Sequence, residues 1–170
     1  MSVVVRRTAL FLAIVFVLTL LAAAAQAAAS RVKFRDNVSP GTIVVKTGQR
    51  RLYYVEGNGY ALRFTVGVGK AGWRWKGRAF IEGKYVKPAW RAPPAMTRSG
   101  NYGPIIAGGS RRNPMGEAAL TMRGGEYAIH GTNNPSSIGG FVSHGCIRMY
   151  NSDIRRLFSL VGIGTPVIVE

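Results

Sequence analysis

Residues 129–149 read I-H-G-T-N-N-P-S-S-I-G-G-F-V-S-H-G-C-I-R-M, and this stretch holds both histidines and the only cysteine of the 170-residue chain. A thiol becomes a useful nucleophile when it is ionised and has a base to take its proton. The residues between His130 and Cys146 are rich in Gly, Asn, Ser and Pro, which favour turns. One folded-back loop can therefore bring the imidazole to the thiol, as in an acyl-transfer site.

The chemistry of the lone cysteine has alternatives. One cysteine cannot close a disulfide within the chain, so it is buried, paired between chains or reactive. His144 and Gly145 beside Cys146, with His130 across the loop, favour a reactive thiol. A rival hypothesis makes the two histidines and the cysteine three zinc ligands, with water as the fourth. Their spacing matches no common metal-binding motif, so acyl transfer is favoured.

The site residues have distinct expected roles. We assign His130 as the base, because it would arrive on a separate strand and can be oriented toward the sulfur independently. His144 lies two residues before Cys146 and receives a supporting role in shaping an oxyanion pocket. The second nitrogen of a catalytic histidine needs a partner. No acidic residue lies within the stretch, so we expect the carbonyl of Gly131 to hold it.

Two further roles concern substrate contacts. The amides of Gly145 and Cys146 are candidate donors to an oxyanion. Arg148 can bind a substrate carboxylate through two parallel hydrogen bonds. The alternative for Arg148 is a structural ion pair with Asp153 or Glu126, and the sequence leaves both open.

The first residues predict an export signal. Arg6 and Arg7 precede an uncharged apolar run from Ala9 to about Ala25, and small residues in an A-x-A pattern follow. We therefore predict a signal peptide over residues 1–29, cleaved near residue 27 or 29. The alternative is an uncleaved membrane anchor, because the run nearly reaches the ~20 residues that span a bilayer. Both place the protein outside the cytoplasm, in the periplasm or cell envelope.

The rest of the chain is long enough for one domain and is strongly basic. The formal net charge is +16, and it falls to +14 without Arg6 and Arg7, the charged residues of the predicted leader. Such a charge favours an anionic partner. The chain is predicted to be exported and has no nucleic-acid-binding motif. We therefore expect its anionic partner to be a polymer of the cell envelope rather than a nucleic acid. The sequence does not indicate an oligomeric state.

The pattern of β-branched and aromatic runs predicts a mainly β fold. One helix is expected, with Asn151 as its N-cap. In residues 67–77, Trp73 and Trp75 either anchor a loop on the core or line a substrate groove. Residues 30–40 are expected to be a short lead-in, and residues 87–115 an irregular surface segment of the kind that often covers sites. The predicted strands are 42–46, 51–55, 61–68, 78–85, 118–123, 126–130 and 165–169.

The stretch resembles the signature of the L,D-transpeptidase catalytic domain (YkuD) family, which is a histidine, a Gly-rich loop and then S/T-H-G-C. Family-like blocks also occur as G-G-S-R-R-N-P-M-G at 108–116 and G-T-P-V-I-V at 164–169. The resemblance thus covers residues 41–170. It implies a β-sandwich or barrel-like domain with one or two short helices, and cysteine acyl transfer on peptidoglycan stem peptides.

By this resemblance, Cys146 matches the family nucleophile, His130 its base, and Ser143, His144 and Gly145 the residues that shape the site. The thiolate would attack the third residue of a tetrapeptide and expel the terminal D-alanine. An amine of another stem, an amine of a wall-anchored lipoprotein, or water would then take the acyl group. The resemblance further implies a role in cell-wall biogenesis and cell shape, acylation by carbapenems, and neither metal nor cofactor.

Two departures from the family pattern matter: the first means that the family's substrate contacts in that loop are not carried over, and the second leaves the acceptor open. Many members carry a P-T-P-T-G-like element where this chain has K-A-G-W-R-W-K-G, and many have Asn where this chain has Arg148. The competing functions are an L,D-carboxypeptidase, in which water resolves the acyl-enzyme, and a basic envelope-binding protein without catalysis.

Overall fold

The computed structural model describes residues 29–124 and 126–170. The predicted signal peptide and its cleavage positions lie outside these residues, except for Ala29. In the part of the chain that is described, no helix is both long and apolar enough to cross a membrane.

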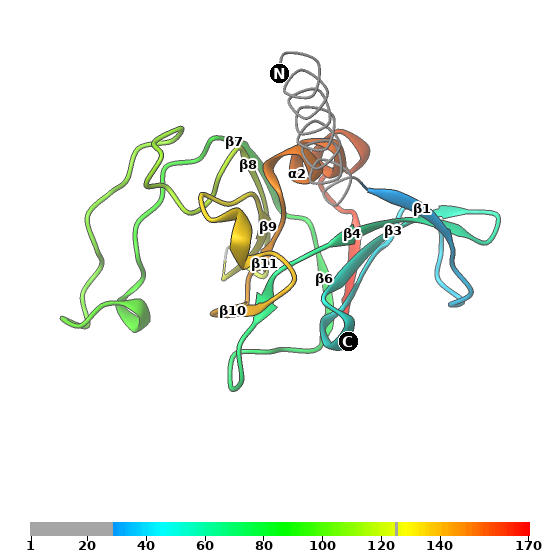
Figure 1. The fold of residues 1–170 in the computed structure, drawn as a ribbon, viewed down its shortest axis with the longest axis horizontal. Helices are drawn as coiled ribbons and strands as arrows, with labels where there is room; N and C mark the ends of the chain where they lie inside the picture. The colour runs from blue at the N-terminus through cyan, green and yellow to red at the C-terminus, as the bar shows by residue number, and fades with distance from the viewer. Residues whose placement is uncertain (1–28, 125) are drawn as a thin grey trace, which may run out of the picture.

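The described chain forms three sheets and one α-helix (Figure 1). The largest sheet has the strand order β1-β4-β3-β2-β12-β6, and β12 runs parallel to β2 while the other neighbours are antiparallel. A four-stranded sheet has the order β11-β9-β8-β7, and β10 pairs with β5 in a short parallel ribbon. The segment 87–115 loops away from the sheets at the far left of Figure 1. The strands are β1 Ser30–Lys33, β2 Ile43–Lys46, β3 Arg51–Gly57, β4 Tyr60–Thr65, β5 Val68–Gly69, β6 Gly77–Phe80, β7 Gly83–Val86, β8 Ala118–Met122, β9 Tyr127–His130, β10 Phe141–Ser143, β11 Ile147–Arg148 and β12 Pro166–Val169; the helix is α2 Asn151–Leu160, and the 3₁₀ turns are η1 Thr47–Gln49, η2 Pro94–Met96 and η3 Pro135–Ser137.

One hydrophobic core joins the two larger sheets to α2. The central strands β2, β8 and β9 are buried along nearly their whole length, and the apolar face of α2 packs into the same core. The Lys84 ammonium group also donates to the carbonyl of Phe158 near the C-terminal end of α2 (2.8 Å). The prediction of a mainly β, sandwich-like domain with one or two short helices is confirmed. Fully buried core side chains include Ile43, Leu52 and Phe64 of the large sheet, Leu120, Met122, Ile129 and Ile147 of the four-stranded sheet, and Ile154 and Leu157 of α2.

Three segments differ from the sequence-based expectation. Residues 78–85 were expected to be one strand, but β6 and β7 belong to different sheets, with the fully buried Ile81 at the crossing. Residues 61–68 likewise divide into β4 and β5. Residues 30–33, expected in the lead-in, form the edge strand β1 against β4. Strand propensity alone does not tell where a chain leaves one sheet for another.

The prediction that Asn151 is the N-cap of α2 is also wrong. Tyr150 occupies the N-cap position and the helix begins at Asn151. The side chain of Asn151 makes its hydrogen bonds to Glu117 and Thr132, outside the helix. The sequence pattern therefore located the start of the helix to within a residue but misassigned the bonds of Asn151.

Candidate active site

The two central residues of the predicted site come from neighbouring strands. β9 and β11 pair in parallel, with Ile129 opposite Ile147 and His130 opposite Arg148. Continuing this register back by one residue sets Cys146 beside Ala128, and a backbone hydrogen bond from Ala128 to the thiol agrees with that position. The thiol therefore lies against β9, the strand that ends with His130.

The turn that carries the thiol is held by Ser143, which is 1% exposed. Its hydroxyl donates to the Cys146 carbonyl (2.6 Å) and accepts from the Gly145 N–H (3.2 Å). The Gly145 amide, one of the two predicted oxyanion donors, is therefore engaged by a side chain. Among the hydrogen bonds of the described residues none starts from the Cys146 N–H, so the second predicted donor is available.

Gly145 sits where no other residue fits. Its φ is +111°, in the region that disfavours L side chains, and an added Cβ would overlap the Tyr127 ring. That ring cannot yield easily, because it stacks on Trp75 with centroids 4.9 Å apart. The indole N–H of Trp75 also donates to the Gly145 carbonyl (3.1 Å). The aromatic pair thus fixes the turn from outside.

We expect Gly145→Ala to lower the free energy of unfolding by about 1–3 kcal/mol, the usual cost of strain at a special backbone conformation combined with overpacking. Urea unfolding of the purified protein measures this change. Gly48→Ala is the matched control, because Gly48 has open space around it and no positive φ. Equal stability of the two variants would contradict this description of the turn.

The two tryptophans of residues 67–77 take different positions. Trp75 packs against the core and anchors the loop, which was the first of the two roles considered from the sequence. Trp73 is 39% exposed and meets His144 edge to face, with ring centroids 4.7 Å apart. Partial burial lowers the pKa of His144, and the positive charges of Lys70 and Arg148 lower it further. An aromatic and cationic wall therefore stands beside the turn that carries the thiol.

His130 is buried, with 4% of its surface exposed. Its Nδ1 lies 2.7 Å from the Gly131 carbonyl, which is the partner expected from the sequence. A carbonyl oxygen only accepts, so Nδ1 carries the hydrogen and Nε2 of the neutral ring presents a lone pair. Burial lowers the pKa of His130 to about 4, helped by the charge of Arg148, while the backbone carbonyls of Gly131 and Pro114 oppose the shift. The imidazole is thus neutral at pH 7, the form that a base requires.

The thiol is also neutral at rest. Burial raises the pKa of Cys146, while the Ala128 backbone hydrogen bond and the charge of Arg148 favour the thiolate and act in the opposite direction. At pH 7 the thiol thus keeps its proton until a base removes it. A neutral thiol on the segment that pairs with the strand of a neutral, buried imidazole is suited to proton transfer during attack rather than before it.

Arg148 does not make either of the ion pairs considered from the sequence. No described carboxylate lies within 4.0 Å of its guanidinium group; Glu126 pairs with Arg123 (3.8 Å) instead, and Asp153 is buried at the start of α2. The backbone of Arg148 exchanges two hydrogen bonds of 2.8 Å with Gly67 and so links β11 to the chain between β4 and β5. Its charge therefore acts on the site without a protein counterion.

The alternatives to this site are a metal centre and a separate surface cavity. The described residues contain no group of three His, Cys, Asp or Glu side chains that could hold a metal, so His130, His144 and Cys146 do not gather as ligands. A cavity of about 380 Å³ opens beside Arg111, Thr132 and Asn133, but neither His130 nor Cys146 lines it. We place the chemistry at the thiol, because the cavity holds neither the cysteine nor a histidine that could activate its Ser110 and Thr132 hydroxyls. Sequence reasoning missed the contributions of Pro114, Tyr127 and Asn151 to the site.

Comparison with known protein families gives one family across most of the chain. The model of the L,D-transpeptidase catalytic domain (YkuD) matches residues 40–169. The probable L,D-transpeptidase YbiS of Escherichia coli K12 is 35% identical over 142 residues, which are 78% of this chain and 45% of that protein. The probable L,D-transpeptidase ErfK/SrfK of the same strain is 39% identical over 140 residues, 78% of this chain and 44% of that protein. This chain thus spans less than half the length of these relatives.

Solved structures show the same fold at low sequence identity. A crystal structure of Enterococcus faecium L,D-transpeptidase superimposes with a TM-score of 0.62 at 19% identity, over 78% of this chain and 50% of that one. The catalytic domain of the E. faecium enzyme acylated by ertapenem gives a TM-score of 0.58 at 21% identity, over 76% of this chain and 95% of that one.

Proposed function

Because the chain belongs to the L,D-transpeptidase catalytic domain (YkuD) family, we propose that it transfers acyl groups between peptidoglycan stem peptides through a thioester on Cys146. The observation that carries this proposal is the pairing of β9 with β11, which sets the thiol against the strand of a buried, neutral histidine. By family resemblance the donor is a tetrapeptide stem, and the bond that breaks joins its third residue to the terminal D-alanine.

The first half-reaction forms the thioester. Nε2 of His130 takes the thiol proton while the sulfur attacks the carbonyl carbon of the third stem residue. The oxyanion develops near the Cys146 N–H, the predicted donor that has no other described partner. The tetrahedral intermediate then collapses, His130 returns the proton to the leaving nitrogen, and D-alanine departs as an amine. The acyl group stays on the sulfur.

The second half-reaction consumes the thioester. An acceptor amine gives a proton to His130 and attacks the thioester carbonyl, and the sulfur leaves and recovers the proton. If the amine belongs to another stem, the product is a crosslink; if it belongs to a wall-anchored lipoprotein, the product is a protein attached to the wall. Attack by water would make the protein an L,D-carboxypeptidase. The burial of His130 favours an amine, because it limits the access of water to the base.

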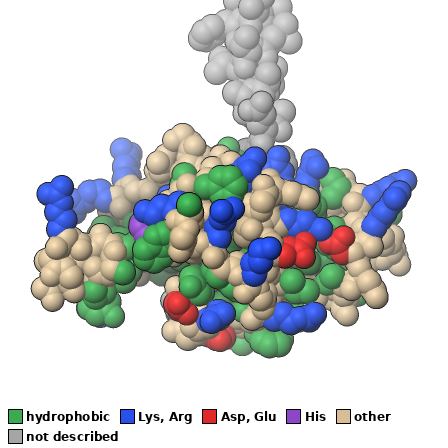
Figure 2. All heavy atoms as spheres, turned by 90° about the horizontal axis from the view of Figure 1, so that it is seen from below, with side chains coloured by type: hydrophobic (Ala, Val, Ile, Leu, Met, Phe, Trp, Pro, Cys, Tyr) green, Lys and Arg blue, Asp and Glu red, His purple; other side chains and the backbone are tan. Residues whose placement is uncertain are grey.

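Substrate recognition would draw on positive charge. Stem peptides carry carboxylates, and the Arg148 guanidinium has no protein carboxylate within reach in the described chain. It can therefore bind a substrate carboxylate through two parallel hydrogen bonds. Lys and Arg side chains also spread over the face shown in Figure 2, with few Asp and Glu among them. The whole charge distribution would attract the protein to the anionic sacculus after export to the periplasm or cell envelope.

Mass spectrometry of stem-peptide products tests the proposal. Purified protein is incubated with disaccharide-tetrapeptides, and crosslinked dimers that have lost one D-alanine are the expected product. Tripeptides and free D-alanine without dimers would identify a carboxypeptidase. Retention on sacculi with no change of any stem peptide, and the same retention for Cys146→Ala, would overturn the enzymatic proposal in favour of a binding protein.

A further inference from the structure

We propose that Asn151 is a positioning residue for His130, because its amide ties together the two backbone segments that contact the imidazole. This inference rests on the proposed role of His130 as the base. Asn151 lies five residues after the thiol, at the first position of α2, and neither the motif nor the chemistry of the thiol requires it.

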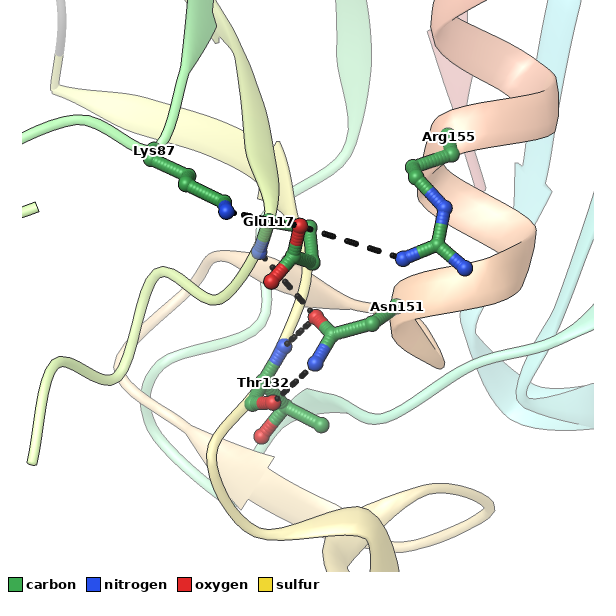
Figure 3. A network of polar contacts seen from close by, with 5 residues as sticks. All are labelled: Lys87, Glu117, Thr132, Asn151 and Arg155. Carbon is green, nitrogen blue, oxygen red and sulfur yellow. Dashed lines mark hydrogen bonds and ion pairs between the residues drawn. The ribbon is translucent and has the colours of Figure 1, made fainter. Parts of the chain in front are cut away.

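Three hydrogen bonds define the contacts of Asn151 (Figure 3). Its Oδ1 accepts from the N–H of Glu117 (3.2 Å) and from the N–H of Thr132 (3.0 Å), and its Nδ2 donates to the Thr132 carbonyl (3.0 Å). The partners fix the orientation of the amide, since two N–H groups must face oxygen and a carbonyl must face nitrogen. One side chain therefore uses both ends to join the segments 114–117 and 131–132.

Both of these segments contact the base. Gly131, which precedes Thr132, supplies the carbonyl that holds Nδ1 of His130 at 2.7 Å. Pro114, three residues before Glu117, presents its backbone carbonyl to the same imidazole. The amide of Asn151 thus fixes the distance between the two peptide segments on which the tautomer and orientation of the ring depend. The Gly131 carbonyl takes the part that a third group plays for a base in other acyl-transfer sites, and Asn151 holds the segment that carries this carbonyl.

The surrounding backbone is shaped to admit this amide. A Cβ at Gly116 or at Gly131 would overlap Oδ1 of Asn151, so both glycines leave the space that the amide fills. Gly131 is also held by its N–H, which donates to the Ala118 carbonyl (3.0 Å). The side chain of Glu117 takes no part in this join. It points to Lys87 (3.7 Å) and Arg155 (3.9 Å) in exposed ion pairs (Figure 3), which contribute little to stability.

The chemistry of position 151 predicts how substitutions rank. Asn151→Asp keeps the acceptor for two N–H groups but loses the donor to the Thr132 carbonyl, so it should hold the segments in part. Asn151→Ala removes all three bonds. Arg155→Gln is the matched control, because it removes a nearby polar contact of the same network and leaves both segments tied to Asn151.

The experiment reads the imidazole directly and the reaction separately. Nitrogen NMR of ¹⁵N-histidine-labelled, tag-free protein reports the tautomer and pKa of His130; His144→Gln in the same background assigns the two rings. In Asn151→Ala we expect the Nδ1–H tautomer to lose its dominance and the pKa of His130 to move further down, because the Gly131 and Pro114 carbonyls that oppose its lowering are no longer held in place. Acylation by ertapenem should slow by about 10- to 100-fold, as for a misplaced catalytic group. The acylation rate and the His130 spectrum of Asn151→Asp should lie between those of the wild type and Asn151→Ala, and those of Arg155→Gln should match the wild type.

Unchanged tautomer and pKa of His130 in folded Asn151→Ala would overturn the proposal, as would equal slowing in Arg155→Gln. If Asn151→Ala does not fold, Asn151→Asp carries the same test. The spectrum of His130 does not depend on catalysis. A wild type that is not acylated would therefore defeat the proposed function, while the imidazole spectrum alone decides the role of Asn151.

Discussion

Cys146→Ala should abolish turnover of tetrapeptide stems, because it removes the only sulfur nucleophile of the chain and with it the thioester path. No second nucleophile stands ready: the Ser143 hydroxyl, the nearest one along the chain, donates to the Cys146 carbonyl and is 1% exposed. The measurement is release of D-alanine from purified disaccharide-tetrapeptides at pH 7. We expect no release above the rate without protein.

The control for this variant is a measurement of whether it still folds. The substitution removes only the sulfur of a partly exposed side chain, so the loss of stability should stay at about 1 kcal/mol or below, and circular dichroism should match the wild type. Cys146→Ser, which keeps a hydroxyl of much higher pKa, should be nearly as inactive. Turnover by folded Cys146→Ala at even a tenth of the wild-type rate would refute a cysteine mechanism.

His130→Gln should slow D-alanine release by about 10²- to 10⁴-fold, the usual contribution of a general base. The reason is specific to this site. Burial raises the pKa of Cys146, so without the imidazole almost no thiolate forms at pH 7. His144→Gln is the matched control, since that ring contacts Trp73 and we assign it no proton transfer. A loss in His144→Gln that equals the loss in His130→Gln would reverse the assignment of the base.

The pH dependence follows from the same pKa values. Because the active form of His130 is neutral and its pKa is about 4, wild-type kcat/KM should stay level from pH 7 to about pH 5 and fall near pH 4. His130→Gln should lack this acid limb and rise with pH as the thiol ionises. Stability changes in the same direction: the unfolded histidine binds its proton near pH 6.5 and the folded one near pH 4. Its contribution to stability is therefore complete above pH 6.5 and is lost as pH falls through 4, so the fold is monitored at each pH.

Much of the site could be predicted from residues 129–149 alone. Both histidines and the cysteine lie in this stretch, so few residues could serve as the base for the thiol. The stretch has no acidic residue, which led to the prediction that the Gly131 carbonyl holds Nδ1 of His130, as it does. The mainly β fold was also predictable, because β-branched runs and turn residues are local signals. These predictions needed only short-range chemistry.

The features that escaped prediction depend on contacts distant in sequence. The hydroxyl that occupies the Gly145 amide and the ring that forbids a side chain at Gly145 are properties of the folded turn. Asn151 looked like an N-cap because Asn before an apolar helical face usually is one, yet its partners lie 19 and 34 residues away. The edge strand β1 forms from a polar segment because β4 offers it a free edge. A single sequence shows none of these pairings.

The central claim is that His130 activates Cys146, and intact-mass spectrometry of ertapenem acylation tests it most directly. Ertapenem acylates the related E. faecium catalytic domain. At pH 7 we predict one adduct per chain, mapped to the peptide that contains Cys146, formed at least about 100 times more slowly in His130→Gln than in the wild type. Equal rates in those two proteins, or an adduct that persists in Cys146→Ala, would contradict the account.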